Sequence, residues 1–99
     1  MLKKYERLSE KVTIKGIIKA KSAISHYINK TNLIYYSELS RLIGCDAFVK
    51  HENHMPTGSF KLRGAINFFH TINKEDVENG VLVSTRGNHG LAMALAARW

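Results

Sequence analysis

The sequence predicts an α/β fold in which helices flank a parallel sheet. Two short and largely apolar runs, residues 47–50 and 81–83, have the length of strands, and each is followed by a loop and a helical pattern. The run at 81–83 is entirely apolar, as in strands buried on both faces of a parallel sheet. Strand, helix, strand and helix in this order form a βαβα unit with a right-handed crossover.

The first half of the chain is expected to begin with an amphipathic helix over residues 9–29. Isoleucines recur along it close to helical spacing, at Ile14, Ile17, Ile18, Ile24 and Ile28. The polar residues 29–32 predict a turn. Residues 33–36 are expected to be extended, and residues 37–43 predict a short helix that Gly44 closes as its C-cap.

The second half is expected to contain two helices separated by the strand at 81–83. A loop over residues 51–58 follows the strand at 47–50, and Ser59 is a favourable N-cap for a helix that extends to about Ile72. The apolar face of this helix has the spacing i, i+3, i+4, i+7, at Leu62, Ala65, Ile66 and Phe69. After the loop at 84–90, a last helix is expected from Leu91 to Trp99.

The composition indicates a globular protein. Ninety-nine residues make one small domain at most, and 44% are hydrophobic while 23% are charged. Cys45 is the single cysteine, so no internal disulfide can form, which favours a reducing compartment. No apolar run approaches the roughly 18 residues of a membrane span, and the first residues lack the apolar core of a signal peptide. We therefore expect a cytoplasmic protein with no membrane partner.

The net charge of +7 is concentrated at the N-terminus. Residues 1–21 contain seven Lys or Arg against two Glu, and the rest of the chain carries only +2. The lysines have the spacing of the solvent-exposed face of a helix. A basic helix can bind phosphate backbones, so a non-catalytic remnant or basic binding module is one alternative. Because the charge is confined to one helix face, we expect no nucleic-acid partner.

The loop before the 59–72 helix contains the first candidate for chemistry, Lys61. In open α/β sheets, ligands bind beyond the carboxyl ends of strands, where helix N-termini present free N–H groups. Lys61 lies in the first helical turn between Phe60 and Leu62, where burial and the helix dipole favour an uncharged amine. An uncharged amine is the nucleophile that an aldehyde requires. An ordinary lysine whose head reaches water explains the spacing equally well.

The loop at 84–90 is the second candidate. Its two glycines allow close approach of a ligand, and Asn88 supplies both a donor and an acceptor, although a simple turn is the alternative. Neither the GxGxxG nor the GxxxxGK[ST] phosphate-binding pattern is present. His51, Glu52 and His54 lack a further ligand at suitable spacing, so we expect no metal.

Together these two loops resemble the threonine/serine dehydratase branch of the fold-type II pyridoxal-phosphate enzymes. The first block reads Pro56-Thr57-Gly58-Ser59-Phe60-Lys61-Leu62-Arg63-Gly64, and the second reads Ser84-Thr85-Arg86-Gly87-Asn88-His89-Gly90. The likeness covers roughly residues 17–99, with both blocks in the right order and at the right separation. It implies a tryptophan-synthase-β-like fold and pyridoxal 5′-phosphate as the cofactor.

The resemblance implies roles for seven residues. Lys61 matches the lysine that condenses with the cofactor's aldehyde and later moves the α-proton of the substrate. Asn88 matches the asparagine that hydrogen-bonds the 3′ oxygen of the cofactor, and Phe60 matches an aromatic residue beside it. The loop that holds the substrate carboxylate corresponds to Ser84, Thr85, Gly87 and His89.

The resemblance further implies an ammonia-lyase that converts threonine or serine into a 2-oxo acid and ammonia. Racemases of this family place a serine immediately before the Gly-Asn pair, where this chain has Arg86, and this favours the lyase. Serine racemase and hydroxyaspartate dehydratase are the alternatives within the family.

The resemblance also predicts the domain organisation. Residues 1–99 are expected to be the N-terminal portion of such an enzyme, with a helical segment at 1–30 and the start of the catalytic α/β domain at 31–99. The family's glycine-rich phosphate loop has no counterpart in these residues. We therefore expect little or no activity from the 99 residues alone, and a homo-oligomer when the protein is full length.

Overall fold

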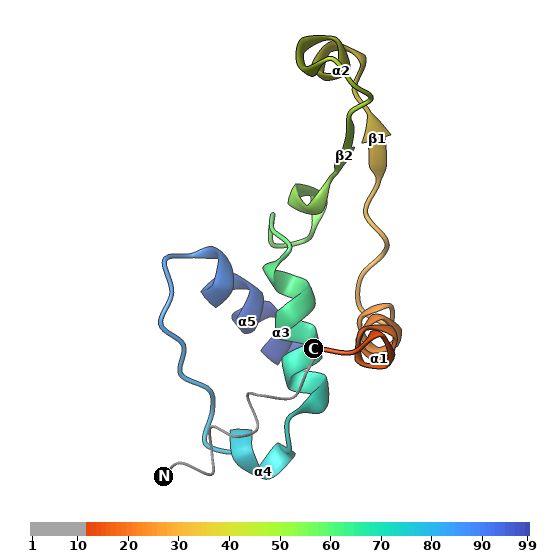
Figure 1. Ribbon diagram of the computed structural model, residues 1–99. Coiled ribbons are helices and arrows are strands. Elements are labelled where there is room, and N and C mark those ends of the chain that lie inside the picture. The colour runs from red at the N-terminus through yellow and green to blue at the C-terminus, as the bar shows by residue number, and fades with distance from the viewer. Residues whose placement is uncertain (1–11) are drawn as a thin grey trace.

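The computed structural model describes residues 12–99 of the chain. The elements in order are α1 (Ile14–Ile24), β1 (Leu33–Tyr35), α2 (Ser37–Ile43), β2 (Phe48–Lys50), the 3₁₀ turn η3 (Glu52–His54), α3 (Lys61–Thr71), α4 (Lys74–Val77) and α5 (Asn88–Arg98). The molecule is elongated, at 53 × 28 × 27 Å. Strands β1 and β2 and helix α2 project away from a body made by α1, α3 and α5 (Figure 1). No helix within residues 12–99 is long and apolar enough to cross a membrane.

Helix α1 is shorter than the sequence predicts. It begins after Thr13, whose Oγ1 accepts a hydrogen bond from the N–H of Gly16 at 3.0 Å. Such a cap satisfies one of the free N–H groups at a helix start. After the last residue of α1, the hydroxyl of Ser25 donates to the carbonyl oxygen of Ser22 at 2.7 Å. Residues 9–11 of the predicted helix lie outside the described part, and residues 25–29 are not helical.

The projecting unit agrees with the predictions for residues 33–50. Strand β1 pairs with β2 in antiparallel fashion, and the Tyr35 ring lies 5.4 Å from that of Phe48 between centroids. Helix α2 ends at Gly44, which has φ 77° and donates its N–H to the carbonyl oxygen of Ser40 at 2.9 Å. Glycine adopts this left-handed conformation without steric cost, so the predicted C-cap is confirmed.

The predicted parallel sheet is not found in the described residues. Residues 81–83 form no strand, and the β1–β2 ladder is the one sheet within residues 12–99. Leu82 is 100% exposed, so this apolar run is not buried on both faces. A parallel strand needs neighbours that take up its N–H and C=O groups. The apolar run predicts burial but does not supply those neighbours, so residues 81–83 form no strand within residues 12–99 and the parallel sheet stays a prediction.

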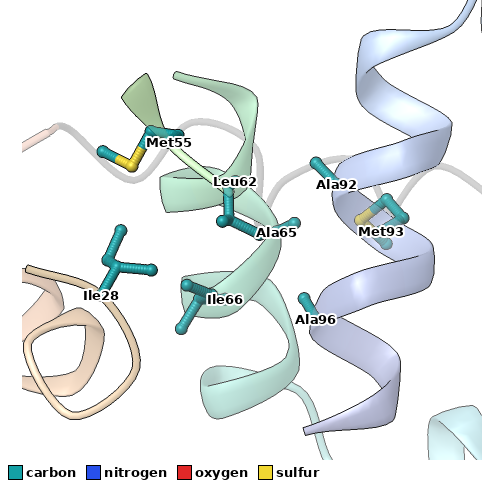
Figure 2. Packing of buried hydrophobic residues seen from close by; sticks show 8 residues of the cluster. All are labelled: Ile28, Met55, Leu62, Ala65, Ile66, Ala92, Met93 and Ala96. Atoms are coloured by element: carbon teal, nitrogen blue, oxygen red, sulfur yellow. The ribbon is translucent and has the colours of Figure 1, made fainter. Parts of the chain in front are cut away.

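The core lies between α3 and α5, and Ile24, the last residue of α1, packs against it. The buried cluster consists of Ile28, Met55, Leu62, Ala65, Ile66, Ala92, Met93 and Ala96. Figure 2 shows Leu62 of α3 opposite Ala92 of α5, and Ile66 level with Ala96. Alanines on both facing sides let the two helix axes approach closely. The predicted apolar face of α3 is thus confirmed at its three buried positions, while Phe69 is only half-buried.

Several local predictions are wrong around these helices. Helix α3 begins after Phe60, and the Ser59 hydroxyl has no hydrogen-bond partner in the described residues, so it is not the N-cap. The short helix α4 was not anticipated from the sequence. Helix α5 begins at Asn88 and not at Leu91, because Thr85 organises its first turn as described below. On α1, Ile14 is 77% exposed, so the isoleucine stripe is covered only at its C-terminal end.

Candidate functional site

The two candidate loops converge at one end of the α3–α5 pair. Both helices run in the same direction and pack side by side (Figures 1 and 2). Lys61 is the first residue of α3, and Asn88 is the first residue of α5. The N-terminal ends of both helices therefore lie at the same end of the body.

Lys61 is exposed at this end of the body. Its Nζ lies 4.9 Å from the centroid of the Phe60 ring, within the range of a cation–π contact, and Phe60 itself is 58% exposed. Leu62 is fully buried, but on a helix its side chain points about 100° away from that of Lys61. Of the two alternatives that the sequence leaves open, the described residues agree with a lysine whose head reaches water and not with an amine crowded by Phe60 and Leu62.

Thr85 organises the second loop. Its Oγ1 accepts hydrogen bonds from the N–H groups of Gly87 at 3.0 Å and Gly90 at 3.1 Å. Both acceptor positions of the hydroxyl are thereby occupied, and its O–H remains free to donate. Gly87 has φ 146° and ψ −79°, which only glycine adopts readily. A Cβ at Gly90 would lie 2.5 Å from Thr85 Cγ2, so this turn also requires a glycine there.

The other predicted residues of this loop are accessible. Ser84, Arg86, Asn88 and His89 are all exposed, with Asn88 and His89 in the first turn of α5. The sequence analysis considered Gly90 only for the close approach of a ligand, and its packing against Thr85 was missed because that contact involves a side chain five positions earlier.

Two buried hydroxyl groups lie on the segment that leads to Lys61. Thr57 is 8% exposed, and neither its Oγ1 nor the Oγ of Ser59 has a hydrogen-bond partner in the described residues. A buried hydroxyl without a partner costs about 1–3 kcal/mol. The loop thus holds polar groups that a ligand or a further part of the protein can satisfy.

An ion pair connects this segment to α3. Arg63 donates from Nε to Glu52 Oε2 at 2.7 Å and from Nη2 to Glu52 Oε1 at 2.9 Å, and the hydroxyl of Thr31 donates to Glu52 Oε1 at 2.6 Å. These hydrogen bonds, with that of Arg63 foremost, lower the pKa of Glu52 to about 2 although partial burial opposes the shift. Sequence reasoning considered Glu52 only as a metal ligand and missed this contact.

The histidines of the loop interact with aromatic and polar neighbours. The rings of His51 and His54 stack with centroids 4.6 Å apart, and His51 Nε2 lies 2.9 Å from the hydroxyl of Tyr36. Within residues 12–99, no three His, Cys, Asp or Glu side chains come together as a metal-binding group.

Comparison with known proteins places the chain in a family. A family model described as "Pyridoxal-phosphate dependent enzyme" matches residues 24–99. Serine racemase of Dictyostelium discoideum is 39% identical over 87 residues, which cover 88% of this chain and 27% of that protein. L-threonine ammonia-lyase of Thermotoga maritima is 37% identical over 87 residues, covering 88% and 22%. L-threo-3-hydroxyaspartate ammonia-lyase of Saccharomyces cerevisiae is 34% identical over 86 residues, covering 87% and 26%.

Solved structures agree with these relatives. The crystal structure of Dictyostelium serine racemase matches with a TM-score of 0.81 at 39% identity, covering 88% of this chain and 28% of that one. Maize serine racemase matches with a TM-score of 0.80 at 34% identity, covering 86% and 27%. The chain belongs to the pyridoxal-phosphate dependent enzyme family. It spans about a quarter of the length of the relatives that it matches.

The residues at the candidate site fit a pyridoxal-phosphate group. Lys61 presents an exposed primary amine, the kind of nucleophile that an aldehyde takes up. Thr57 and Ser59, whose hydroxyls have no hydrogen-bond partner in the described residues, precede it. Gly87 has no side chain, so a ligand can approach its backbone closely. Asn88 offers an amide at the neighbouring helix start. An amine, hydroxyls and an amide at two helix N-termini suit an anionic aromatic aldehyde.

Proposed function

We propose that this chain forms the cofactor-anchoring part of a pyridoxal-phosphate-dependent threonine/serine ammonia-lyase, which converts a hydroxy amino acid into a 2-oxo acid and ammonia. The observation that carries the proposal is the common location of Lys61 and Asn88 at the starts of two parallel, packed helices. Relatives that include an L-threonine ammonia-lyase support the reaction class. Racemases of the family are expected to carry a serine immediately before the Gly-Asn pair. This chain has Arg86 at that position, which supports elimination over racemisation.

In this proposal each residue has a distinct task. The Lys61 amine binds the cofactor's aldehyde carbon and afterwards carries the substrate's α-proton, while Phe60 packs beside the cofactor. Asn88 donates to the 3′ oxygen. When bound, pyridoxal phosphate supplies an electron sink that makes loss of the α-proton feasible.

The second loop is proposed to hold the substrate's carboxylate. Because both acceptor positions of Thr85 are occupied, its hydroxyl can only donate, which suits an anionic oxygen. The bare backbone of Gly87 and the exposed side chains of Ser84 and His89 are proposed to complete this contact.

Substrate comparison on the intact protein tests the reaction. With pyridoxal phosphate and L-threonine or L-serine, the proposal predicts accumulation of a 2-oxo acid and ammonia, detected as the hydrazone of the oxo acid. Formation of D-serine without oxo acid would refute the lyase assignment. The 99 residues alone are expected to give neither product, since the described residues contain no glycine-rich phosphate loop.

Serine racemase is the second candidate. It is favoured by a specific observation, namely that the serine racemase of Dictyostelium matches this chain at 39% identity and the threonine ammonia-lyase of Thermotoga at 37%. L-threo-3-hydroxyaspartate extends the test to a third activity of the family.

We further propose that the complete protein works in the cytoplasm and that it is a homo-oligomer. Light scattering, which gives the molar mass in solution, tests the oligomeric state.

A non-catalytic basic module is the alternative of another class. Lys15, Lys19 and Lys21 of α1 are exposed and available to an anionic partner. Salt-dependent retention on nucleic acid, together with no absorbance change on adding pyridoxal phosphate, would favour this alternative over the enzyme.

A further inference from the structure

Arg63 and Glu52 close the loop that leads to the lysine. Arg63 lies two residues after Lys61 on α3, and Glu52 lies in η3 directly after β2. The guanidinium donates two hydrogen bonds to the two carboxylate oxygens, at 2.7 and 2.9 Å. A two-point contact between planar groups fixes orientation as well as distance. The segment between these residues is thereby tied at both ends.

Further contacts hold the same loop from within. The N–H of Met55 donates to the carbonyl oxygen of Glu52 at 3.2 Å, and the N–H of Gly58 donates to that of Met55 at 2.8 Å. The Met55 side chain is 5% exposed and belongs to the α3–α5 core. The Thr31 hydroxyl donates at 2.6 Å to Glu52 Oε1, the oxygen that also accepts from Arg63 Nη2, and Lys50 donates from Nζ to the carbonyl oxygen of Thr31. The loop thus has an apolar anchor and a polar one.

The ion pair differs from a surface pair elsewhere in the chain. The side chains of Arg63 and Glu52 are 34% and 23% exposed, whereas those of Arg41 and Glu38, three positions apart on α2, are 79% and 81% exposed. Exposed pairs contribute little because water screens them and long side chains lose entropy. The Glu38–Arg41 pair is therefore a matched control within the same molecule.

We propose that Glu52 and Arg63 are positioning residues that set the direction of the Lys61 side chain toward the cofactor's aldehyde. Successive residues of a helix point about 100° apart, so fixing the Arg63 guanidinium against Glu52 fixes the rotation of the first turn of α3. Lys61 occupies that turn. This inference rests on the proposed function, in which the Lys61 amine binds the cofactor.

Trapping of the cofactor tests the proposal in the intact protein. Pyridoxal phosphate is added at low occupancy, the adducts are reduced with borohydride, and mass spectrometry gives the share of label on Lys61 relative to the exposed Lys15 and Lys19. We expect the unmodified protein to label Lys61 preferentially. Glu52→Gln and Arg63→Met lose this preference, Arg63→Lys retains part of it, and Glu38→Gln leaves it unchanged.

Amide hydrogen exchange without cofactor provides a second readout. Loss of the ion pair should speed exchange at the Met55 and Gly58 amides about tenfold, the effect of roughly 1.4 kcal/mol on local opening. Exchange in the variants is measured under conditions where circular dichroism shows them folded.

The outcomes separate the two proposals. Unchanged labelling of Lys61 in Glu52→Gln and Arg63→Met overturns the positioning role, even if the variants are less stable. If the unmodified protein shows no preference for Lys61, the proposed function fails. The ion pair is then judged by exchange at Met55 and Gly58, and unchanged exchange overturns its role in ordering the loop.

Discussion

The pH dependence of stability follows from the environment of Glu52. Its pKa is lowered from 4.5 to about 2, first by the hydrogen bonds from Arg63 and also by Thr31 and the positive charge of Lys50, while desolvation opposes the shift. Because the pKa is lower in the folded state, the contribution to stability is complete above the unfolded value of 4.5. It is lost as the pH falls from about 5 toward 2.

The size of this contribution can be bounded from the structure. One pKa unit corresponds to about 1.4 kcal/mol, so the full shift sets an upper bound of about 3.4 kcal/mol. The two side chains are 23% and 34% exposed, and solvent screening reduces the value. We expect Glu52→Gln to lower the free energy of unfolding by about 1–2 kcal/mol near pH 7.

Urea denaturation of the intact protein, followed by circular dichroism from pH 2 to 7, measures this difference. The gap in unfolding free energy between the unmodified protein and Glu52→Gln should be constant above about pH 5.5 and close toward pH 2. Glu38→Gln, which alters the exposed pair, should shift the free energy by less than about 0.5 kcal/mol at every pH. A gap that does not vary with pH, or an equal loss in Glu38→Gln, would show that the Glu52–Arg63 contact is not formed as described.

Four further substitutions, one of them used in a double variant, test the packing and the second loop. Leu62→Ala removes a fully buried side chain between α3 and α5 and should lower the free energy of unfolding by about 2–4 kcal/mol, measured by denaturant midpoint. Gly90→Ala places a Cβ 2.5 Å from Thr85 Cγ2 and should weaken pyridoxal-phosphate binding measured by absorbance titration. Thr85→Ser removes that methyl group and should restore binding in the double variant. Gly87→Ala forces alanine to φ 146° and should destabilise the loop by more than about 1 kcal/mol, seen as faster exchange at the Gly90 amide.

Local signals in the sequence predict much of the fold correctly. The helix at 37–43 with its glycine cap and the buried face of α3 are encoded within a few neighbouring positions, by φ preference and by helical spacing. The strand predicted at 81–83, in contrast, is not formed in the described residues. Its apolar character is local, but pairing depends on backbone groups from distant parts of a chain.

In the candidate site, too, features set by neighbouring residues are easier to predict than contacts between distant residues. The glycine-containing loops predict that a helix follows each of them, but α3 begins at Lys61 without the Ser59 cap, and α5 begins at Asn88, three residues earlier than expected. The Glu52–Arg63 pair spans eleven positions across a 3₁₀ turn, and no periodicity in the sequence indicates it. The sequence left the exposure of Lys61 open, because its two apolar neighbours suggest burial while the helical spacing of Leu62 and Ile66 puts the apolar face elsewhere.

The most direct test of the account is the site at which pyridoxal phosphate attaches. Borohydride reduction of the intact protein with pyridoxal phosphate, followed by peptide mass spectrometry, should place the label on Lys61. Lys61→Ala should abolish both that label and the visible absorbance of the bound cofactor. Undiminished absorbance in Lys61→Ala, or label spread evenly over the exposed lysines of α1, would contradict the central claim that Lys61 anchors the cofactor.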